Sequence, residues 1–481
     1  PGLRPWEIWL SEAQERMVLA TPPANLPRLQ AICDGLDVEW TVIGRFTGDK
    51  RLRVRYGGQL VADIDMDFLH NGWSTGMMRA VWTPPDLPEP DPEPGADLTS
   101  TLLEMLAHPD VASKESVIRR YDHEVQGATV VKPLVGAASD GPSDAAVLKP
   151  LETKGWQGLA IGCGINPHYG RIDPYAMAWA AIDEALRNVV CVGADPDRVA
   201  LLDNFCWGNP RLPDRLGRLV RAAQGCHDAA IAYGAPFISG KDSLNNEYLD
   251  PQGEKRAIPP TLLISSMGSV PDVRQAVTMD LKAAGNRLYI VGETRAELGG
   301  SLYHRLQGSL GRGVPEPLPD AIETMRALHQ AMCAGLVRAC HDCSEGGLAV
   351  AAAEMAFAGR LGLDLNLAHL PCSTDVDRDD VALFAESSGR FLVEAQPEDV
   401  TAFEAALTGR PFACLGSIAT PSGEGGAEDA PGAVSASRTR PQRERELEPS
   451  TRFRVRGLRG DTVVDCPLDD LLRAWQSPEA M

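Results

Sequence analysis

The sequence predicts an α+β protein of several domains in which one domain element occurs twice. The chain has 481 residues, which is enough for roughly three domains. Hydrophobic residues make up 44% of it and charged residues 23%, a composition that supports buried cores. Strand-like apolar runs alternate with helix-like segments, and both a proline-rich connector and an ordered internal repeat divide the chain.

Two segments have the composition of connectors. Residues 84–95 form an acidic, proline-rich run, which we expect to be extended and exposed between two domains. Residues 421–450 are rich in Gly, Ala, Ser, Glu and Arg and contain almost no large apolar residue. That composition predicts a disordered insertion within a domain, which we expect to be dispensable.

The internal repeat joins the beginning of the chain to its end. Four segments align in the same order: Ser11 to Leu19 with Ala385 to Val393, Val42 to Gly44 with Cys414 to Gly416, Arg51 to Val54 with Arg452 to Val455, and Asp67 to Leu69 with Asp470 to Leu472. The first segment of each copy ends in a strand-like apolar run. Residues 1–83 therefore resemble the tail of a domain whose complete copy closes the chain.

Residues 139–247 contain acidic, amide and glycine positions suited to a magnesium nucleotide. Asp144 precedes the apolar run 145–148, which predicts a buried strand with the carboxylate at its edge. Residues 176–190 predict a helix, on which Glu184 and Asn188 are four residues apart and share a face. Magnesium prefers oxygen ligands, so Asp144, Glu184 and Asn188 are ligand candidates. The alternative is that Glu184 and Asn188 form a solvated helix pair.

A second polar segment follows the short apolar run 235–238. Ser239, Gly240, Lys241, Asp242 and Ser243 predict a turn that offers backbone amides, a hydroxyl, a cation and a carboxylate together. Glycine there lets the backbone approach a phosphate closely. An ordinary strand-to-loop turn is the alternative. None of these segments matches the phosphate-loop or kinase glycine-loop pattern.

Charge and cysteine usage narrow the class of protein. The formal net charge of -20 and a pI near 4.9 argue against a nucleic-acid or acidic-membrane partner, because those surfaces require clustered Lys and Arg. The eleven cysteines show no framework of short spacings, which suggests a reducing compartment. Cys340 and Cys343 form a lone CxxC pair, and a zinc site needs more ligands. Without a signal peptide or long apolar stretch, we expect a cytoplasmic location.

The order and identity of these motifs resemble the phosphoribosylformylglycinamidine synthase family, within the aminoimidazole ribonucleotide synthetase superfamily. The resemblance covers nearly the whole chain. The segments that carry it are as follows: 11–17, 108–114, 144–147, 166–169, 173–175, 184–188, 208–210, 240–244, 341–348 and 386–390. It implies an A-type half-barrel domain and a B-type α/β sandwich domain. The expected units are 1–83, the end of a first B domain; 84–97, the linker; 98–272, an A domain; and 273–481, a second B domain.

The resemblance also implies a reaction, a purine-biosynthesis ligation. ATP phosphorylates the amide oxygen of formylglycinamide ribonucleotide, and ammonia from glutamine displaces the phosphate to give the amidine. Glu12, Ala13, Gln14 and Ser243 occupy substrate-binding positions of the family. Asp203, Gly240 and Lys241 occupy nucleotide-contacting positions, and Asp242 is a further metal candidate. Ala13 replaces the usual serine of the tripeptide, which removes one hydroxyl.

The same resemblance implies a second nucleotide. Asp144, Glu184 and Asn188 match positions that, in the fused forms of the family, hold magnesium on an auxiliary, structural ADP. The loop Ser344 to Leu348 enters a helix whose N-terminus could hold a phosphate. It could instead be a helix cap with glycines for packing. Lys241 stands where forms without a fused glutaminase often place a metal-contacting Asn.

Several parts of the family's machinery are expected elsewhere. The catalytic histidines and an ATP-binding lysine belong to an A domain that would lie upstream of Pro1, so we expect a fragment with no catalytic residue of its own. A separate glutaminase subunit and a small bridging subunit are implied as partners. Two alternatives remain: another synthetase of the superfamily, against which the duplicated B segment speaks, and a non-catalytic nucleotide-binding half.

Overall fold

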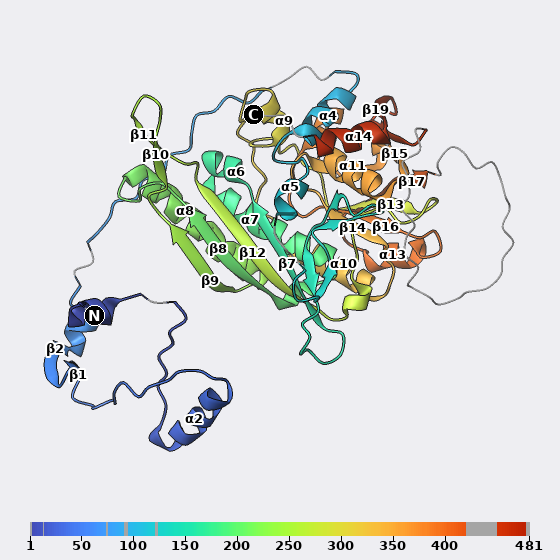
Figure 1. Cartoon of the computed structure of the whole chain (residues 1–481). Coiled ribbons are helices and arrows are strands. Elements are labelled where there is room, and N and C mark those ends of the chain that lie inside the picture. Colours follow the sequence, from blue (N-terminus) through green and yellow to red (C-terminus); the bar gives the residue numbers. More distant parts are fainter. Residues whose placement is uncertain are drawn as a thin grey trace. The chain divides into compact units, whose positions relative to one another are not determined.

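A computed structural model describes residues 2–12, 14–73, 76–90, 95–120, 124–419 and 450–477 (Figure 1). The chain forms two compact units, Pro1–Met78 and Arg79–Met481. The predicted insertion 421–450 lies outside the described residues, apart from Ser450. Among the described residues, no helix combines the length and apolarity needed to span a bilayer.

The first unit is built from short elements around one β-hairpin. Its elements are α1 (Pro5–Leu10), η1 (Pro23–Asn25), α2 (Leu26–Gly35), β1 (Arg51–Tyr56), β2 (Gln59–Asp65) and α3 (Met66–Asn71). Strands β1 and β2 pair antiparallel across Gly57 and Gly58, whose positive φ angles of 55° and 83° suit the tight turn. None of the described residues in this unit is buried.

The second unit contains two large sheets, and the first has six strands. Its order is β3 (Thr129–Val131), β6 (Ala146–Leu148), β7 (Gly158–Ile165), β12 (Thr261–Val270), β8 (Val199–Cys206) and β9 (Phe237–Ser243). Only β8 and β9 pair in parallel. Three helices, α6 (Pro167–Ile172), α7 (Pro174–Cys191) and α8 (Pro213–Tyr233), accompany this sheet.

Helix α7 lies directly on this sheet because β7 presents small residues to it. A Cβ atom on Gly164 would lie 2.1 Å from the Ala181 carbonyl oxygen, so no larger residue fits there. On the opposite face, Ile161 and Cys163 are exposed. The predicted strand after Asp144 and the predicted helix 176–190 are both confirmed, as β6 and α7.

The second sheet has seven strands and is accompanied by six helices within the described ranges. Its order is β14 (Ala339–Asp342), β16 (Phe391–Ala395), β13 (Arg287–Val291), β17 (Phe412–Ala419), β15 (Gly362–Asn366), β18 (Arg452–Arg456) and β19 (Thr462–Pro467). Its helices are α9 (Leu302–Leu306), α10 (Ala321–Cys333), α11 (Gly347–Gly359), α12 (Asp379–Phe384), α13 (Val400–Ala406) and α14 (Leu468–Gln476). Every residue of α11 is buried.

Smaller elements complete the second unit. They are α4 (Thr99–Ala107), α5 (Glu115–Ile118), β4 (Leu134–Val135), β5 (Gly141–Pro142), η2 (Pro196–Arg198), β10 (Glu247–Leu249), β11 (Lys255–Ala257), η3 (Val273–Gln275) and η4 (Leu367–His369). One continuous hydrophobic core runs through this unit, and α7 contacts β14 across the two sheets. The mixed sheets confirm the α+β class predicted from sequence.

One local prediction is wrong. The segment Ser239 to Ser243 was expected to be a turn, but it lies within strand β9. Parallel pairing with β8 holds it extended, with Asp203 opposite Gly240 and Asn204 opposite Lys241. Small polar residues at a sheet edge can form a strand when the neighbouring strand supplies the hydrogen bonds.

Candidate functional site

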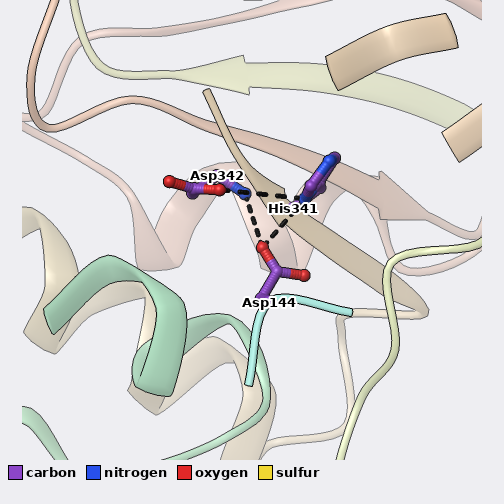
Figure 2. Close-up of side chains that lie close together, drawn as sticks. All are labelled: Asp144, His341 and Asp342. Carbon is purple, nitrogen blue, oxygen red and sulfur yellow. Dashed lines mark hydrogen bonds and ion pairs between the residues drawn. The ribbon is translucent and has the colours of Figure 1, made fainter. Parts of the chain in front are cut away.

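Asp144 lies in the loop before β6 and reaches toward the end of β14. Its Oδ1 accepts a hydrogen bond from the backbone N–H of Asp342 at 3.0 Å and lies 2.8 Å from His341 Nδ1 (Figure 2). Its Oδ2 is buried and has no hydrogen-bond partner. A buried carboxylate oxygen without a donor is costly unless a ligand satisfies it. Asp144, His341 and Asp342 each offer one atom that could bind a metal ion, and these three atoms lie within 4.8 Å of one another.

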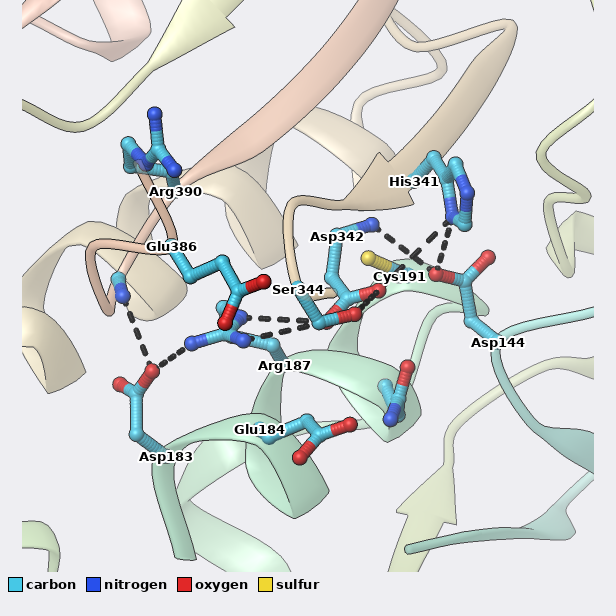
Figure 3. Close-up of polar contacts among 12 residues, drawn as sticks. Asp144, Asp183, Glu184, Arg187, Cys191, His341, Asp342, Ser344, Glu386 and Arg390 are labelled. Atoms are coloured by element: carbon cyan, nitrogen blue, oxygen red, sulfur yellow. Dashed lines mark hydrogen bonds and ion pairs between the residues drawn. The ribbon is translucent and has the colours of Figure 1, made fainter. Parts of the chain in front are cut away.

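Glu184 projects from α7 toward the same region (Figure 3), and Asn188 follows one helical turn later. Glu184 Oε2 accepts from the backbone N–H of Ile165 at 2.9 Å, and Asn188 Nδ2 donates to the Cys163 carbonyl at 2.7 Å. Asn188 is 8% exposed, and Glu184 is half-buried. The alternative of a solvated helix pair does not hold, because each side chain forms a hydrogen bond with the backbone of β7.

Several carboxylates lie close together here, on elements that accompany both sheets. Burial raises the pKa of Glu184 well above its ordinary value, and the neighbouring Glu345 and Asp342 raise it further. Burial also raises the pKa of Glu345 to about 8, with Glu386 adding to the effect. Like charges this close resist ionisation unless a cation joins them. The chemistry of this donor set therefore fits a hard divalent cation.

Arg187 compensates part of this negative charge. It forms ion pairs with Asp183, one helical turn earlier on α7, and with Asp342 Oδ2 at 3.2 Å. Figure 3 shows the guanidinium between the two carboxylates. The pKa of Asp342 is nevertheless raised, first by burial and then by Asp144, against the opposing effect of Arg187. Arg187 thus orients Asp342. Asp144 faces His341 instead, and Glu184 forms no ion pair with a basic side chain in the described part of the chain.

A second group of predicted residues lies where β8 and β9 pair. Gly240 faces Asp203, and a Cβ atom at Gly240 would come within 2.5 Å of Asp203 Oδ2. Burial raises the pKa of Asp203, and the nearby Asp242 raises it further. Lys241 Nζ donates to Ser243 Oγ at 3.1 Å. The absence of a side chain at Gly240 lets the Asp203 carboxylate lie directly on the backbone, and a Cβ atom there would displace it.

The structure divides the four metal candidates into two groups. Asp144 precedes β6, which is separated from β9 by β7, β12 and β8. Asp242 lies on β9, at the edge of the sheet, and belongs with Asp203 rather than with Asp144, Glu184 and Asn188. Glu12 and Gln14 are exposed in the first unit, and Ala13 lies outside the described residues.

The loop before α11 is fixed by Glu386. One carboxylate oxygen of Glu386 accepts from the backbone N–H groups of Gly346 and Leu302, both at 2.9 Å, and the other accepts from Tyr169 Oη at 2.7 Å. Glu386 thus joins α6, the start of α9 and the loop 344–347. The predicted loop-to-helix transition is confirmed, with α11 beginning at Gly347.

Sequence reasoning missed Asp342, Glu345 and Glu354 as members of this site. Asp342 follows His341 in the lone CxxC segment, which lacked the spacing of a zinc site and was set aside. Glu345 lies in the loop expected to bind phosphate through backbone groups. Asp342 contacts Asp144, which is distant in the sequence, and Glu354 contacts His341, so no local pattern could have revealed these contacts.

Family models match most of the second unit and part of the first. The C-terminal domain model of AIR synthase related proteins matches residues 1–57 and 283–420, and the N-terminal domain model matches residues 142–270. One model matching two separate regions of the chain confirms the duplicated B element. The predicted combination of an A-type and a B-type domain is confirmed as well.

Curated relatives extend the likeness over most of the chain. A Deinococcus radiodurans protein, phosphoribosylformylglycinamidine synthase subunit PurL, is 39% identical over 434 residues, covering 86% of this chain and 55% of the relative. PurL of Thermococcus sibiricus is 33% identical over 425 residues, covering 87% and 55%. The chain therefore spans about half the length of the relatives that it matches.

Solved structures agree on the fold. Thermotoga maritima PurL complexed with FGAR aligns with a TM-score of 0.56 and 17% identity, covering 79% of this chain and 54% of that one. The complex with ADP aligns with a TM-score of 0.55, also at 17% identity, covering 79% and 52%. The solved structures show the fold, and the domain models and curated relatives show the family. The chain thus belongs to the AIR synthase related family, as a relative of the PurL subunit of phosphoribosylformylglycinamidine synthase.

Proposed function

We propose that this chain is the nucleotide-holding part of a PurL-type synthetase, which makes formylglycinamidine ribonucleotide from formylglycinamide ribonucleotide, ATP and ammonia. The 39% identity to PurL over 434 residues supports this assignment. The single structural observation that carries the nucleotide-holding role is the buried carboxylate cluster in which Asp144 Oδ2 has no partner. Such a cluster is unfavourable on its own and becomes favourable around a cation.

The reaction requires activation of an amide oxygen. The γ-phosphoryl group passes from ATP to that oxygen, with release of ADP; ammonia then adds to the carbon, and inorganic phosphate leaves as the amidine forms. We assign Glu12, Ala13, Gln14 and Ser243 to the ribonucleotide. We assign Asp203, Gly240 and Lys241 to ATP. Lys241 is exposed on β9 and already turned toward Ser243, so its ammonium group is available to a phosphate.

We assign the magnesium ligands to two places. Asp242 lies beside the ATP residues, whereas Asp144, Glu184 and Asn188, now joined by Asp342, surround the carboxylate cluster. Bound magnesium would neutralise phosphate charge at either place. The second place includes the buried Asn188 and Asp342 and lies close to the loop 344–347, which suits a nucleotide that is retained, such as a structural ADP, rather than turned over.

Taken alone, the chain should hold nucleotide without turnover. In the family, the catalytic histidines belong to another A domain, and glutamine-derived ammonia comes from a separate glutaminase through an assembly with a small bridging subunit. These remain proposed partners. A reducing, cytoplasmic setting is consistent with the eleven cysteines, all of which are free. Another synthetase of the superfamily is less favoured, because a single A and B pair would not carry the duplicated B element.

The test combines turnover with analysis of the bound nucleotide. The purified chain is given magnesium ATP, ammonia and formylglycinamide ribonucleotide, ADP release is followed, and nucleotide freed on denaturation is quantified. We expect stoichiometric ADP that survives purification, and no substrate-dependent ADP release. Substrate-dependent release would show that the chain is catalytically complete. Absence of both bound nucleotide and turnover would overturn the proposal.

A further inference from the structure

His341 lies between two carboxylates that come from different parts of the second unit. Its Nδ1 is 2.8 Å from Asp144 Oδ1, and its Nε2 is 2.9 Å from Glu354 Oε2 on α11. His341 is 6% exposed and Glu354 9%. Glu354, His341 and Asp144 therefore form a continuous chain of buried polar contacts, which ends at the carboxylate cluster.

This arrangement makes His341 a hydrogen-bond donor rather than a metal ligand. An imidazole coordinates a cation through a nitrogen that carries a lone pair. Here each ring nitrogen faces a carboxylate oxygen, and an ionised carboxylate only accepts hydrogen bonds. Both nitrogens are thus used as donors, although Nδ1 lies close to the oxygens of Asp144 and Asp342.

The contact with His341 helps to fix the orientation of the Asp144 carboxylate. Its Oδ1 receives two donors, His341 Nδ1 and the backbone N–H of Asp342, while Oδ2 receives none and is buried. Rotation of the carboxylate about its Cβ–Cγ bond, away from this orientation, would break both bonds. The two donors therefore hold one oxygen in place and present the other to whatever fills the cluster.

We propose that His341 and Glu354 are positioning residues that set Asp144 so that Oδ2 is the atom offered to a bound metal nucleotide. The proposal rests on the proposed function of this cluster as a metal-nucleotide site. Partners of this kind behind a ligand typically change metal affinity by about 10- to 100-fold when they are removed. Glu354 acts through His341, because its carboxylate fixes the ring by holding Nε2.

Two polar replacements of His341 distinguish a positioning role from a merely structural one. Asn carries its amide nitrogen at the place of Nδ1, and Gln carries its amide nitrogen at the place of Nε2. His341→Asn thus keeps the donor toward Asp144 and loses the contact with Glu354, and His341→Gln does the reverse. Each variant loses one buried hydrogen bond, so a merely structural role predicts similar losses for both.

The measurement is the affinity of the full chain for Mn²⁺ in the presence of excess ADP, from the electron paramagnetic resonance signal of free Mn²⁺. Thermal unfolding in EDTA reports stability separately. We expect His341→Gln to weaken Mn²⁺ binding by about 10-fold or more and His341→Asn to stay within about threefold of the wild type. Their unfolding temperatures in EDTA should be similar. Equal loss of affinity in both variants, or no loss in His341→Gln, would overturn the positioning role.

Glu354 gives a second comparison in case a histidine variant fails to fold. Glu354→Gln keeps an acceptor for Nε2 and should retain the affinity within about threefold, whereas Glu354→Met should lose about 10-fold. Equal affinities in these two variants would contradict the proposal.

The Asp144→Asn variant shows whether a negative result concerns the metal site or the positioning role. If the wild type and Asp144→Asn bind Mn²⁺ alike, or if neither binds, the proposal of a metal site at this cluster is wrong. If Asp144→Asn loses binding while the His341 and Glu354 variants keep it, the metal site stands and the positioning role is wrong.

Discussion

The two copies of the repeated element have the same local structure and opposite burial. Strands β1 and β2 pair in the register of β18 and β19, and each hairpin has an irregularity after its valine, Val54 or Val455. Leu52 of the first copy is only half-buried, whereas its counterpart Phe453 is fully buried. A hairpin can therefore be encoded by its own residues, while its burial is not.

The apolar run before the hairpin shows the same difference more strongly. Met17 and Val18 are 84% and 86% exposed, and their counterparts Phe391 and Leu392 are fully buried. The second copy forms β16, which pairs with β13 and β14, whereas no described strand includes Met17. Both partner strands come from residues 283–384, directly before the second copy. Strand formation thus follows from the pairing partner more than from the propensity of the run.

The largest effect should come from matched truncations in these runs. Leu392→Ala removes a fully buried side chain and should lower the free energy of unfolding by about 2 to 5 kcal/mol. Val18→Ala, at the aligned position, should change it by less than about 0.5 kcal/mol, because the side chain is exposed. Urea denaturation of the purified chain measures both values. Comparable losses in the two variants would mean that the first copy also has a packed core.

The aligned arginines should give the next largest effect. Arg390 is fully buried and donates to Ser387 O and Thr294 Oγ1, both at 3.0 Å, and to Ala385 O. Arg390→Met would leave these acceptors without a donor, at a cost of about 3 kcal/mol in the free energy of unfolding. Arg16→Met is the control and should leave stability nearly unchanged, since Arg16 is exposed. A stable Arg390→Met protein would contradict this view.

The aligned glutamates test the comparison through pH. Burial raises the pKa of Glu386 above its ordinary value of 4.5, against the opposing hydrogen bonds. The protonated form therefore favours the folded state, and this contribution is complete below the ordinary pKa and is lost as pH rises through the folded-state pKa. We expect the wild type to lose stability relative to Glu386→Gln as pH rises from 4 to 8. Thermal unfolding across this range measures the difference, with Glu12→Gln as the exposed control.

Sequence reasoning found the parts of the site that depend on local spacing. Glu184 and Asn188 follow from helical periodicity, and Asp144 follows from its place before a buried strand. It could not find Glu354 or Asp342, because their contacts with His341 and Asp144 depend on how the second sheet packs near α7. It also mistook β9 for a turn, because the hydrogen bonds that keep this segment extended belong to β8.

The smallest effect should be the same in both copies. Arg51 Nε lies 2.5 Å from Asp63 Oδ1, and Arg452 Nε lies 2.5 Å from Asp465 Oδ1. The side chains of the two pairs are similarly exposed, 37% and 35% in the first pair and 38% and 38% in the second. Exposed pairs contribute little because water and salt screen them.

Asp63→Asn and Asp465→Asn should therefore each shift the unfolding transition by no more than about 2 °C, and the shift should shrink in high salt. Differential scanning calorimetry at low and high ionic strength measures both. A large, salt-independent decrease in the unfolding temperature of Asp465→Asn alone would mean that the burial of Phe453 also strengthens the ion pair on the charged face of this hairpin. Equal small losses would mean that the two copies share everything the hairpin itself encodes and differ only in what packs against it.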